Sequence, residues 1–146
     1  MIRKLYELKS TEEAHTEAAG TTLAEMILEN KLPRFVALYG GLGAGKTAFT
    51  RGICRVFSPS ASVRSPSFSI VNEYRGKTDV FHFDVWRITD DDDLYSTGFY
   101  DYSDRDGVII CEWAENIEYA LPGEYIKVSI EGNGDLPRNI KAELIT

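Results

Sequence analysis

A glycine-rich octapeptide is the part of the chain whose residue types and spacing specify a chemistry most clearly. Residues 40–47 read GGLGAGKT, which matches the phosphate-binding pattern G-x-x-x-x-G-K-[ST]. Glycines let successive backbone N–H groups turn inward around phosphate oxygens, where side chains would collide with the anion. Lys46 would then contact the β and γ phosphates, and the hydroxyl of Thr47 would coordinate Mg²⁺. The pattern therefore predicts a nucleotide site, and we expect it to bind ATP or ADP with Mg²⁺.

The segments on either side of this loop have the character that the motif requires. A short, mostly apolar run at 34–39 predicts a strand directly before the loop, and residues 47–57 carry apolar side chains at helical spacing directly after it. Strand, glycine loop and helix form the context in which the pattern binds phosphate, whereas a flexible turn is the alternative interpretation. The residues of this region that we expect to contact the nucleotide are Gly41, Gly43, Ala44, Gly45, Lys46, Thr47 and Ala48.

Hydrolysis of the nucleotide would also require a carboxylate to hold Mg²⁺ and a group to orient the attacking water. Glu112 ends the apolar run 107–113, which is suited to a buried central strand, and ligands of doubly wound sheets lie beyond the carboxyl ends of strands. Asp84, in the β-rich segment 79–86, is the second candidate, with a solvated aspartate on a hairpin as the alternative. His82 shares a face with Asp84 by alternation, and we interpret it as a structural hydrogen-bonding residue.

A polar stretch rich in serine and proline, residues 58–67, follows the helix of the phosphate-binding loop and predicts an irregular loop. Its last residue, Ser67, could act as a switch that senses the γ-phosphate. An ordinary loop serine is the alternative interpretation.

The remaining elements must position these groups. Ser10 to Glu13 fits a capping box, which predicts a first helix over 11–29 with Ser10 as its N-cap. An acidic run at 90–93 suggests the start of a short helix, and a second short helix is expected at 114–121.

Two hairpins are expected in addition. The first joins 68–74 to 79–86 and would lie beside the strand at 34–39, and the second joins the alternating segments 125–130 and 139–145. The predicted fold class is therefore α/β: a three-layer, mixed sheet like that of P-loop NTPases, with helices on both faces and antiparallel hairpins.

Composition restricts the class of protein further. The chain has 146 residues, of which 43% are hydrophobic, so we expect one domain over 1–146 with a single core. No stretch approaches the ~20 apolar residues of a membrane span, and we expect a cytoplasmic protein. The formal net charge of −7 opposes direct binding to nucleic acid but permits docking to a basic protein partner. Cys54 and Cys111 lack a metal-binding spacing and are expected to be buried, reduced thiols.

These motifs, taken in order, resemble one small family. The phosphate-binding loop is widely shared, but its combination with the three later motifs is similar to the bacterial TsaE (YjeE) family over nearly the whole chain. The three are Ser65-Pro66-Ser67-Phe68, His82-Phe83-Asp84-Val85-Trp86-Arg87 and Glu112-Trp113. Two positions depart from the family pattern, since Ser67 stands where threonine is commoner and Trp86 where tyrosine is commoner.

The resemblance implies an ATPase that works with the TsaB and TsaD proteins in making threonylcarbamoyladenosine at position 37 of tRNA. The chain would meet tRNA only indirectly, through that complex. By motif, Thr47 and Glu112 would hold Mg²⁺, and Asp84 would belong to the catalytic or metal-proximal groups. Ser10 and Thr11 would approach the adenine, and Arg138 would contact the nucleotide.

Three other functions are compatible with a phosphate-binding loop. A GTPase would need a guanine-reading N-K-x-D motif, which the sequence lacks, and its D-x-x-G match at 104–107 precedes a strand, so a turn explains it better. A small-molecule kinase would need an acceptor pocket and usually an arginine-bearing lid, but the segment 87–106 has only Arg87 and Arg105 among many acidic residues. A non-catalytic switch, whose nucleotide only changes a docking surface, remains open.

Overall fold

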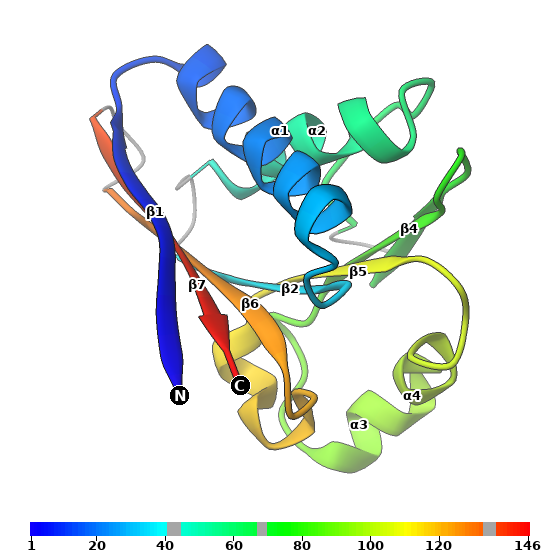
Figure 1. Cartoon of the computed structure of the whole chain (residues 1–146). Coiled ribbons are helices and arrows are strands. Elements are labelled where there is room, and N and C mark those ends of the chain that lie inside the picture. Colours follow the sequence, from blue (N-terminus) through cyan, green and yellow to red (C-terminus); the bar gives the residue numbers. More distant parts are fainter. Residues whose placement is uncertain (41–44, 67–69, 133–136) are drawn as a thin grey trace.

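The computed structural model describes residues 1–40, 45–66, 70–132 and 137–146, and these residues form a seven-stranded mixed sheet with helices on both faces (Figure 1). The strand order is β1-β7-β6-β2-β5-β4-β3. The strands are β1 (Ile2–Ser10), β2 (Phe35–Tyr39), β3 (Val71–Tyr74), β4 (Val80–Asp84), β5 (Val108–Glu112), β6 (Tyr125–Glu131) and β7 (Arg138–Ile145). The predicted three-layer α/β class is confirmed.

The central strands run parallel, which fixes where their carboxyl ends lie. β2 pairs in parallel with both β5 and β6, and β4 pairs in parallel with β5. β4 and β5 are buried along their whole length, as expected of strands covered on both faces. The last residues of β2, β4 and β5 therefore meet at one edge of the sheet, where ligands of such sheets bind.

One face of the sheet is covered by two long helices, α1 (Glu13–Asn30) and α2 (Lys46–Phe57) (Figure 1). Glycines let the two helices cross closely, because a Cβ on Gly20 would overlap the carbonyl of Phe49 and a Cβ on Gly52 would overlap the carbonyl of Glu17. Their aliphatic core with the sheet includes Leu23 and Ile53. This packing holds the N-terminus of α2 at the carboxyl edge of the strands.

The other face carries the short helices α3 (Asp91–Ser96) and α4 (Phe99–Tyr102) and the 3₁₀ helix η1 (Ala114–Ala120) (Figure 1). Its core is aromatic: the ring of Phe83 meets the rings of Phe99 and Tyr102 edge to face, with centroids 5.2 Å and 5.1 Å away. The acidic run begins α3 as predicted, since the side chain of Asp90 accepts a hydrogen bond of 2.8 Å from the backbone of Asp93.

The start of the chain differs from the prediction. Residues Ile2–Ser10 form a strand that we did not predict from the sequence, and α1 begins at Glu13 instead of at residue 11. The predicted capping box is wrong: the N-cap is Glu12, which makes no side-chain cap hydrogen bond. Ser10 instead ends β1 opposite Arg138, because pairing with β7 holds it in extended backbone.

The two predicted hairpins form, but one has a different neighbour. β3 and β4 pair antiparallel, and so do β6 and β7, whose connecting residues 133–136 lie outside the described part of the chain. The expectation that the first hairpin lies beside β2 is wrong, because β5 is inserted between β2 and β4. The buried run ending at Glu112 is therefore a central strand next to β2, which leads into the glycine-rich loop.

Two further expectations concern the thiols and the membrane. Cys54 and Cys111 are both buried and unbridged, as predicted. Among the described residues, no helix has the length and apolarity needed to cross a membrane.

Candidate active site

Two acidic side chains meet where β4 and β5 end. Asp84 and Glu112 are the terminal residues of these strands and face each other in register, and Glu112 is also the partner of Leu38 on β2. Gly40, the first residue of the phosphate-binding pattern, follows β2 at this same edge. Asp84 is 7% exposed and Glu112 is 4% exposed. The structure thus brings the two predicted carboxylates together beside the predicted phosphate site.

Lys46 supplies a buried positive charge at this edge. It is the first residue of α2, and its Nζ donates a 2.9 Å hydrogen bond to the carbonyl of Gly40. The same ammonium lies 4.1 Å from the centre of the Trp113 ring, within cation–π range. Burial lowers the pKa of Lys46, while the carboxylates of Glu112, Glu115 and Asp84 act in the opposite direction. Free N–H groups at the start of α2 would add to an anion site there.

Each carboxylate is oriented by one hydrogen bond. The backbone N–H of Trp86 donates to Asp84 Oδ1 at 3.0 Å, and burial raises the pKa of Asp84. Glu112 Oε2 lies 2.5 Å from Nε2 of the fully buried His82. The interpretation of His82 as a structural hydrogen-bonding residue is confirmed, although the sequence did not identify Glu112 as its partner. We call Lys46, His82, Asp84 and Glu112 the carboxylate cluster.

The chemistry of the donor groups fits Mg²⁺. Within the described residues, the second oxygen of each carboxylate accepts no hydrogen bond from the protein, and Thr47 lies half-buried in the first turn of α2. These residues offer only oxygen, the ligand atom that Mg²⁺ prefers, and Mg²⁺ keeps several waters instead of requiring a complete protein cage. No group of three or more His, Cys, Asp or Glu that could hold a metal ion occurs among the described residues.

A second polar cluster lies on the other side of Gly45. The hydroxyls of Ser10 and Thr16, both fully buried, are 2.8 Å apart, and Arg138 Nη1 donates to Thr16 Oγ1 at 3.5 Å. In the described part of the chain, Arg138 Nε is the buried side-chain polar atom that has no hydrogen-bond partner. We call Ser10, Thr16 and Arg138 the arginine cluster.

Gly45 connects this cluster to the phosphate-binding loop. Its φ of 96° is a left-handed conformation that favours glycine, and a Cβ there would lie 2.5 Å from Arg138 Nη1. The guanidinium therefore borders the predicted phosphate site, where an unpaired nitrogen favours an anionic ligand.

The other predicted contacts divide into three groups. Thr11 is exposed next to Ser10, where its backbone N–H donates to His15 Nδ1 at 3.2 Å. Ala48 is buried in α2. The predicted contacts Gly41, Gly43, Ala44 and Ser67 lie outside the described residues.

Sequence reasoning missed three features of the site. Thr16 completes the arginine cluster, yet it carried no signal beyond its place on the buried face of α1. Trp113 has a left-handed backbone, with φ 62°, which turns the chain sharply after Glu112. Tyr74 hydrogen-bonds His82 Nδ1 at 3.0 Å, and only the pairing of β3 with β4 brings these residues together.

Comparison with known proteins identifies a family for the chain. The family model described as "Threonylcarbamoyl adenosine biosynthesis protein TsaE" matches residues 10–140, a range that contains both polar clusters. The chain belongs to the TsaE family. The resemblance expected from the sequence motifs is thereby confirmed.

Relatives in this family cover most of the chain. The Haemophilus influenzae protein named "tRNA threonylcarbamoyladenosine biosynthesis protein TsaE" is 36% identical over 126 residues, which are 84% of this chain and 78% of that protein. A Bacillus subtilis protein of the same name is 39% identical over 72% of this chain and 66% of its own length. The crystal structure of Bacillus subtilis YdiB matches with a TM-score of 0.74 and 27% identity, covering 100% of this chain and 88% of that one.

Proposed function

We propose that this protein binds ATP with Mg²⁺ and hydrolyses it in support of the threonylcarbamoyladenosine modification of tRNA at position 37, together with TsaB and TsaD. The observation that carries the proposal is the meeting of Lys46, Asp84 and Glu112, all buried, at the edge where the phosphate-binding loop begins. Burial of charge is unfavourable for the fold, so such clusters are a mark of functional sites. The names of the family's members support the tRNA part of the proposal.

Lys46, Asp84 and Glu112 of the carboxylate cluster, together with Thr47, have the main roles in this proposal. Lys46 would turn from the carbonyl of Gly40 to the β and γ phosphates, and its confinement over the Trp113 ring keeps the ammonium close to them. Thr47, Glu112 and Asp84 would hold Mg²⁺, which neutralises charge on the phosphate oxygens during hydrolysis. Asp84 and Glu112 would also orient the attacking water, since each keeps an oxygen that no described protein group engages.

The arginine cluster and the surface charge suggest the remaining contacts. Arg138 would bind the nucleotide beside Gly45, while Ser10 and Thr11 would approach the adenine. The net charge of −7 supports contact with tRNA through partner proteins instead of direct binding, because a polyanion repels an acidic surface.

The decisive experiment compares ATP hydrolysis by this protein alone with hydrolysis in the presence of TsaB and TsaD. We expect slow hydrolysis alone and strong stimulation in the complex, since isolated P-loop proteins often need a partner to order their switch segments. Nucleotide binding is followed in parallel by the fluorescence of Trp113, which adjoins the proposed Mg²⁺ ligand. Unchanged emission at millimolar ADP, together with silent calorimetry, would exclude the nucleotide site.

Glu112→Ala separates an enzyme from a nucleotide-dependent switch. We expect the variant to retain nucleotide yet lose turnover in the reconstituted tRNA-modification reaction by about 100-fold or more, because a group that holds metal and water has been removed. Glu118→Ala, on an exposed position of η1, is the matched control and should keep full turnover. Full multi-turnover activity in Glu112→Ala would contradict the catalytic role and favour the switch.

A further inference from the structure

A continuous series of hydrogen bonds runs from the surface loop 58–66 to the proposed Mg²⁺ ligand. The backbone N–H of Arg64 donates to the hydroxyl of Tyr74 at 3.2 Å, and that hydroxyl lies 3.0 Å from His82 Nδ1. His82 Nε2 then lies 2.5 Å from Glu112 Oε2. Tyr74, His82 and Glu112 are buried on three adjacent strands, β3, β4 and β5.

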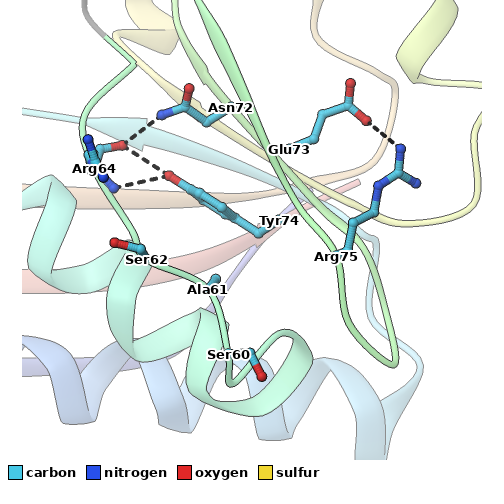
Figure 2. Close-up of a pocket in the computed structure, with 8 residues that line it drawn as sticks. All are labelled: Ser60, Ala61, Ser62, Arg64, Asn72, Glu73, Tyr74 and Arg75. Atoms are coloured by element: carbon cyan, nitrogen blue, oxygen red, sulfur yellow. Dashed lines mark hydrogen bonds and ion pairs between the residues drawn. The ribbon is translucent and has the colours of Figure 1, made fainter.

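Figure 2 shows the outer end of this series, in an open pocket of about 470 Å³ between the loop and β3. The hydroxyl of Tyr74 points at the backbone of Arg64, and it lies 3.0 Å from that residue's carbonyl as well. Asn72 Nδ2 also donates to the Arg64 carbonyl, at 3.1 Å. The loop is thus held against β3 by the backbone of Arg64.

The hydroxyl of Tyr74 has one proton and two acceptors within 3.0 Å. The carbonyl of Arg64 and Nδ1 of His82 compete for this proton, so the position of Arg64 affects how His82 is bonded. Because the side chains of Tyr74, His82 and Glu112 are buried, an unsatisfied member among them would be costly, and their bonds must rearrange together.

The same segment is attached to the second carboxylate strand at its far end. The backbone N–H of Ile70 donates to the carbonyl of Pro66 at 2.9 Å, and the N–H of Asp84 donates to the carbonyl of Ile70 at 2.8 Å. Ile70 has φ 70°, which is sterically disfavoured for a β-branched residue. Ile70, which follows residues 67–69, is therefore bonded to β4, the strand of Asp84, and Pro66, which precedes them, is bonded to Ile70.

We propose that Tyr74 and His82 are positioning residues that connect the loop 58–66 to Glu112 and set the orientation of its carboxylate for Mg²⁺. This deepens the proposed function and rests on its assignment of Glu112 as a Mg²⁺ ligand. His82 fixes one oxygen of Glu112 and leaves the other for the metal, while Tyr74 fixes the ring of His82 and relates it to the loop. Groups that orient metal ligands in this way commonly change metal affinity or activity by about 10- to 100-fold when removed.

The first test measures how far Mg²⁺ strengthens ATP binding by the full chain, as the ratio of the Kd in EDTA to the Kd in Mg²⁺. Tyr74→Phe removes only the hydroxyl and should lower this ratio about fivefold, the effect of one lost hydrogen bond, with the Kd in EDTA unchanged. Tyr6→Phe is the matched control, because it deletes another hydroxyl, which donates to the Ala19 carbonyl at 2.6 Å and takes no part in the series from Arg64 to Glu112. Equal ratios in Tyr74→Phe and Tyr6→Phe would overturn the proposal.

Two substitutions of His82 separate its two bonds. Gln places an amide nitrogen near the position of Nε2 and can still bond Glu112, whereas Asn places one near Nδ1 and can bond only Tyr74. We expect the ratio of the Kd in EDTA to the Kd in Mg²⁺ to fall about tenfold in His82→Asn. In His82→Gln, most of the ratio of the unmodified protein should be retained. The same low ratio in both variants, with intact thermal unfolding curves, would show a structural role only. If either variant fails to fold, Tyr74→Phe decides the question.

A test without nucleotide distinguishes failure of this inference from failure of the proposed function. In the nucleotide-free protein, Glu112→Gln should shift the backbone amide resonance of Arg64 in NMR spectra, because the perturbation passes through His82 and Tyr74. The shift should disappear in the Tyr74→Phe background. A shift that persists there, or no shift in either protein, would overturn the connection even if ATP binding is normal. If the shift appears with Glu112→Gln and disappears in the Tyr74→Phe background, but the protein binds no ATP, only the proposed function is overturned.

Discussion

The two polar clusters on either side of Gly45 are built in opposite ways. The carboxylate cluster gathers both signs of charge, and its members other than Lys46 come from adjacent strands of the buried, central part of the sheet. The arginine cluster has one cation supported by two neutral hydroxyls, and it is formed where the antiparallel strands β1 and β7 meet α1. One cluster offers carboxylate oxygens together with an ammonium, whereas the other offers a guanidinium and neutral hydroxyls.

The difference also concerns how rigidly each cluster is held. Asp84 and Glu112 end strands that are hydrogen-bonded on both sides, and each carboxylate has a specific partner. Arg138 has a long donor–acceptor distance of 3.5 Å to Thr16 and an unpaired Nε within the described residues. The carboxylate cluster is therefore preorganised, while the guanidinium has bonding capacity left for a ligand.

The largest expected effect is that of Lys46→Ala on ATP affinity. Hydrogen bonds to charged groups contribute ~1.5–3 kcal/mol each, so loss of this ammonium should weaken binding of Mg²⁺ and ATP by about 100-fold in calorimetry. Arg55→Ala removes a cation from the last turn of the same helix, where it pairs with Glu17 at 2.6 Å, and should bind ATP normally. Similar losses in both variants would mean that general charge, not the carboxylate cluster, determines affinity.

A smaller effect is expected for Arg138→Ala. The unpaired guanidinium nitrogen should add one charge-assisted bond to the nucleotide, so its loss should weaken ATP binding about tenfold. Lys141→Ala on the same strand, where the lysine pairs with Glu143 at 3.8 Å, provides the control. If calorimetry shows a greater loss of ATP affinity for Arg138→Ala than for Lys46→Ala, the arginine cluster contributes more to ATP binding than the carboxylate cluster, which contradicts the expected order.

The smallest expected effect is a gain in stability. Asp84→Asn should raise the free energy of unfolding of the nucleotide-free protein at pH 7 by ~0.5–2 kcal/mol, because functional residues are often destabilising and an amide avoids burying a charge. Urea unfolding measures this gain. Asp104→Asn, at an exposed position, should leave stability unchanged.

The pH dependence of this gain has a defined sign. Burial raises the pKa of Asp84, so the folded protein holds the proton more tightly than the unfolded chain, whose aspartates titrate near ~3.9. The contribution of Asp84 to stability is therefore favourable at low pH and lost as pH rises through the folded pKa. The advantage of Asp84→Asn should shrink as pH falls toward ~4, and an advantage that grows in acid would contradict a raised pKa.

Local patterns predicted the elements that carry the carboxylate cluster. The apolar run before the glycine loop is β2, the run ending at Glu112 is the buried strand β5, and the helix after the loop is α2. These predictions succeeded because apolar periodicity and glycine spacing act within a few residues. The arginine cluster was only partly anticipated, through Ser10 and Arg138, and the reason given for Ser10, a capping box, was wrong.

The sequence by itself determined the family and singled out the glycine-rich motif at 40–47 and the two carboxylates, because each depends on residue type and short spacing. Only the tertiary structure decided that β5 separates β2 from β4, that Ser10 faces Arg138, and that Tyr74 reaches Glu112 through His82. These contacts join residues between 8 and 128 positions apart, as in Tyr74 to His82 and Ser10 to Arg138. Strand order and core packing set such contacts, and the local pattern around each residue does not record them.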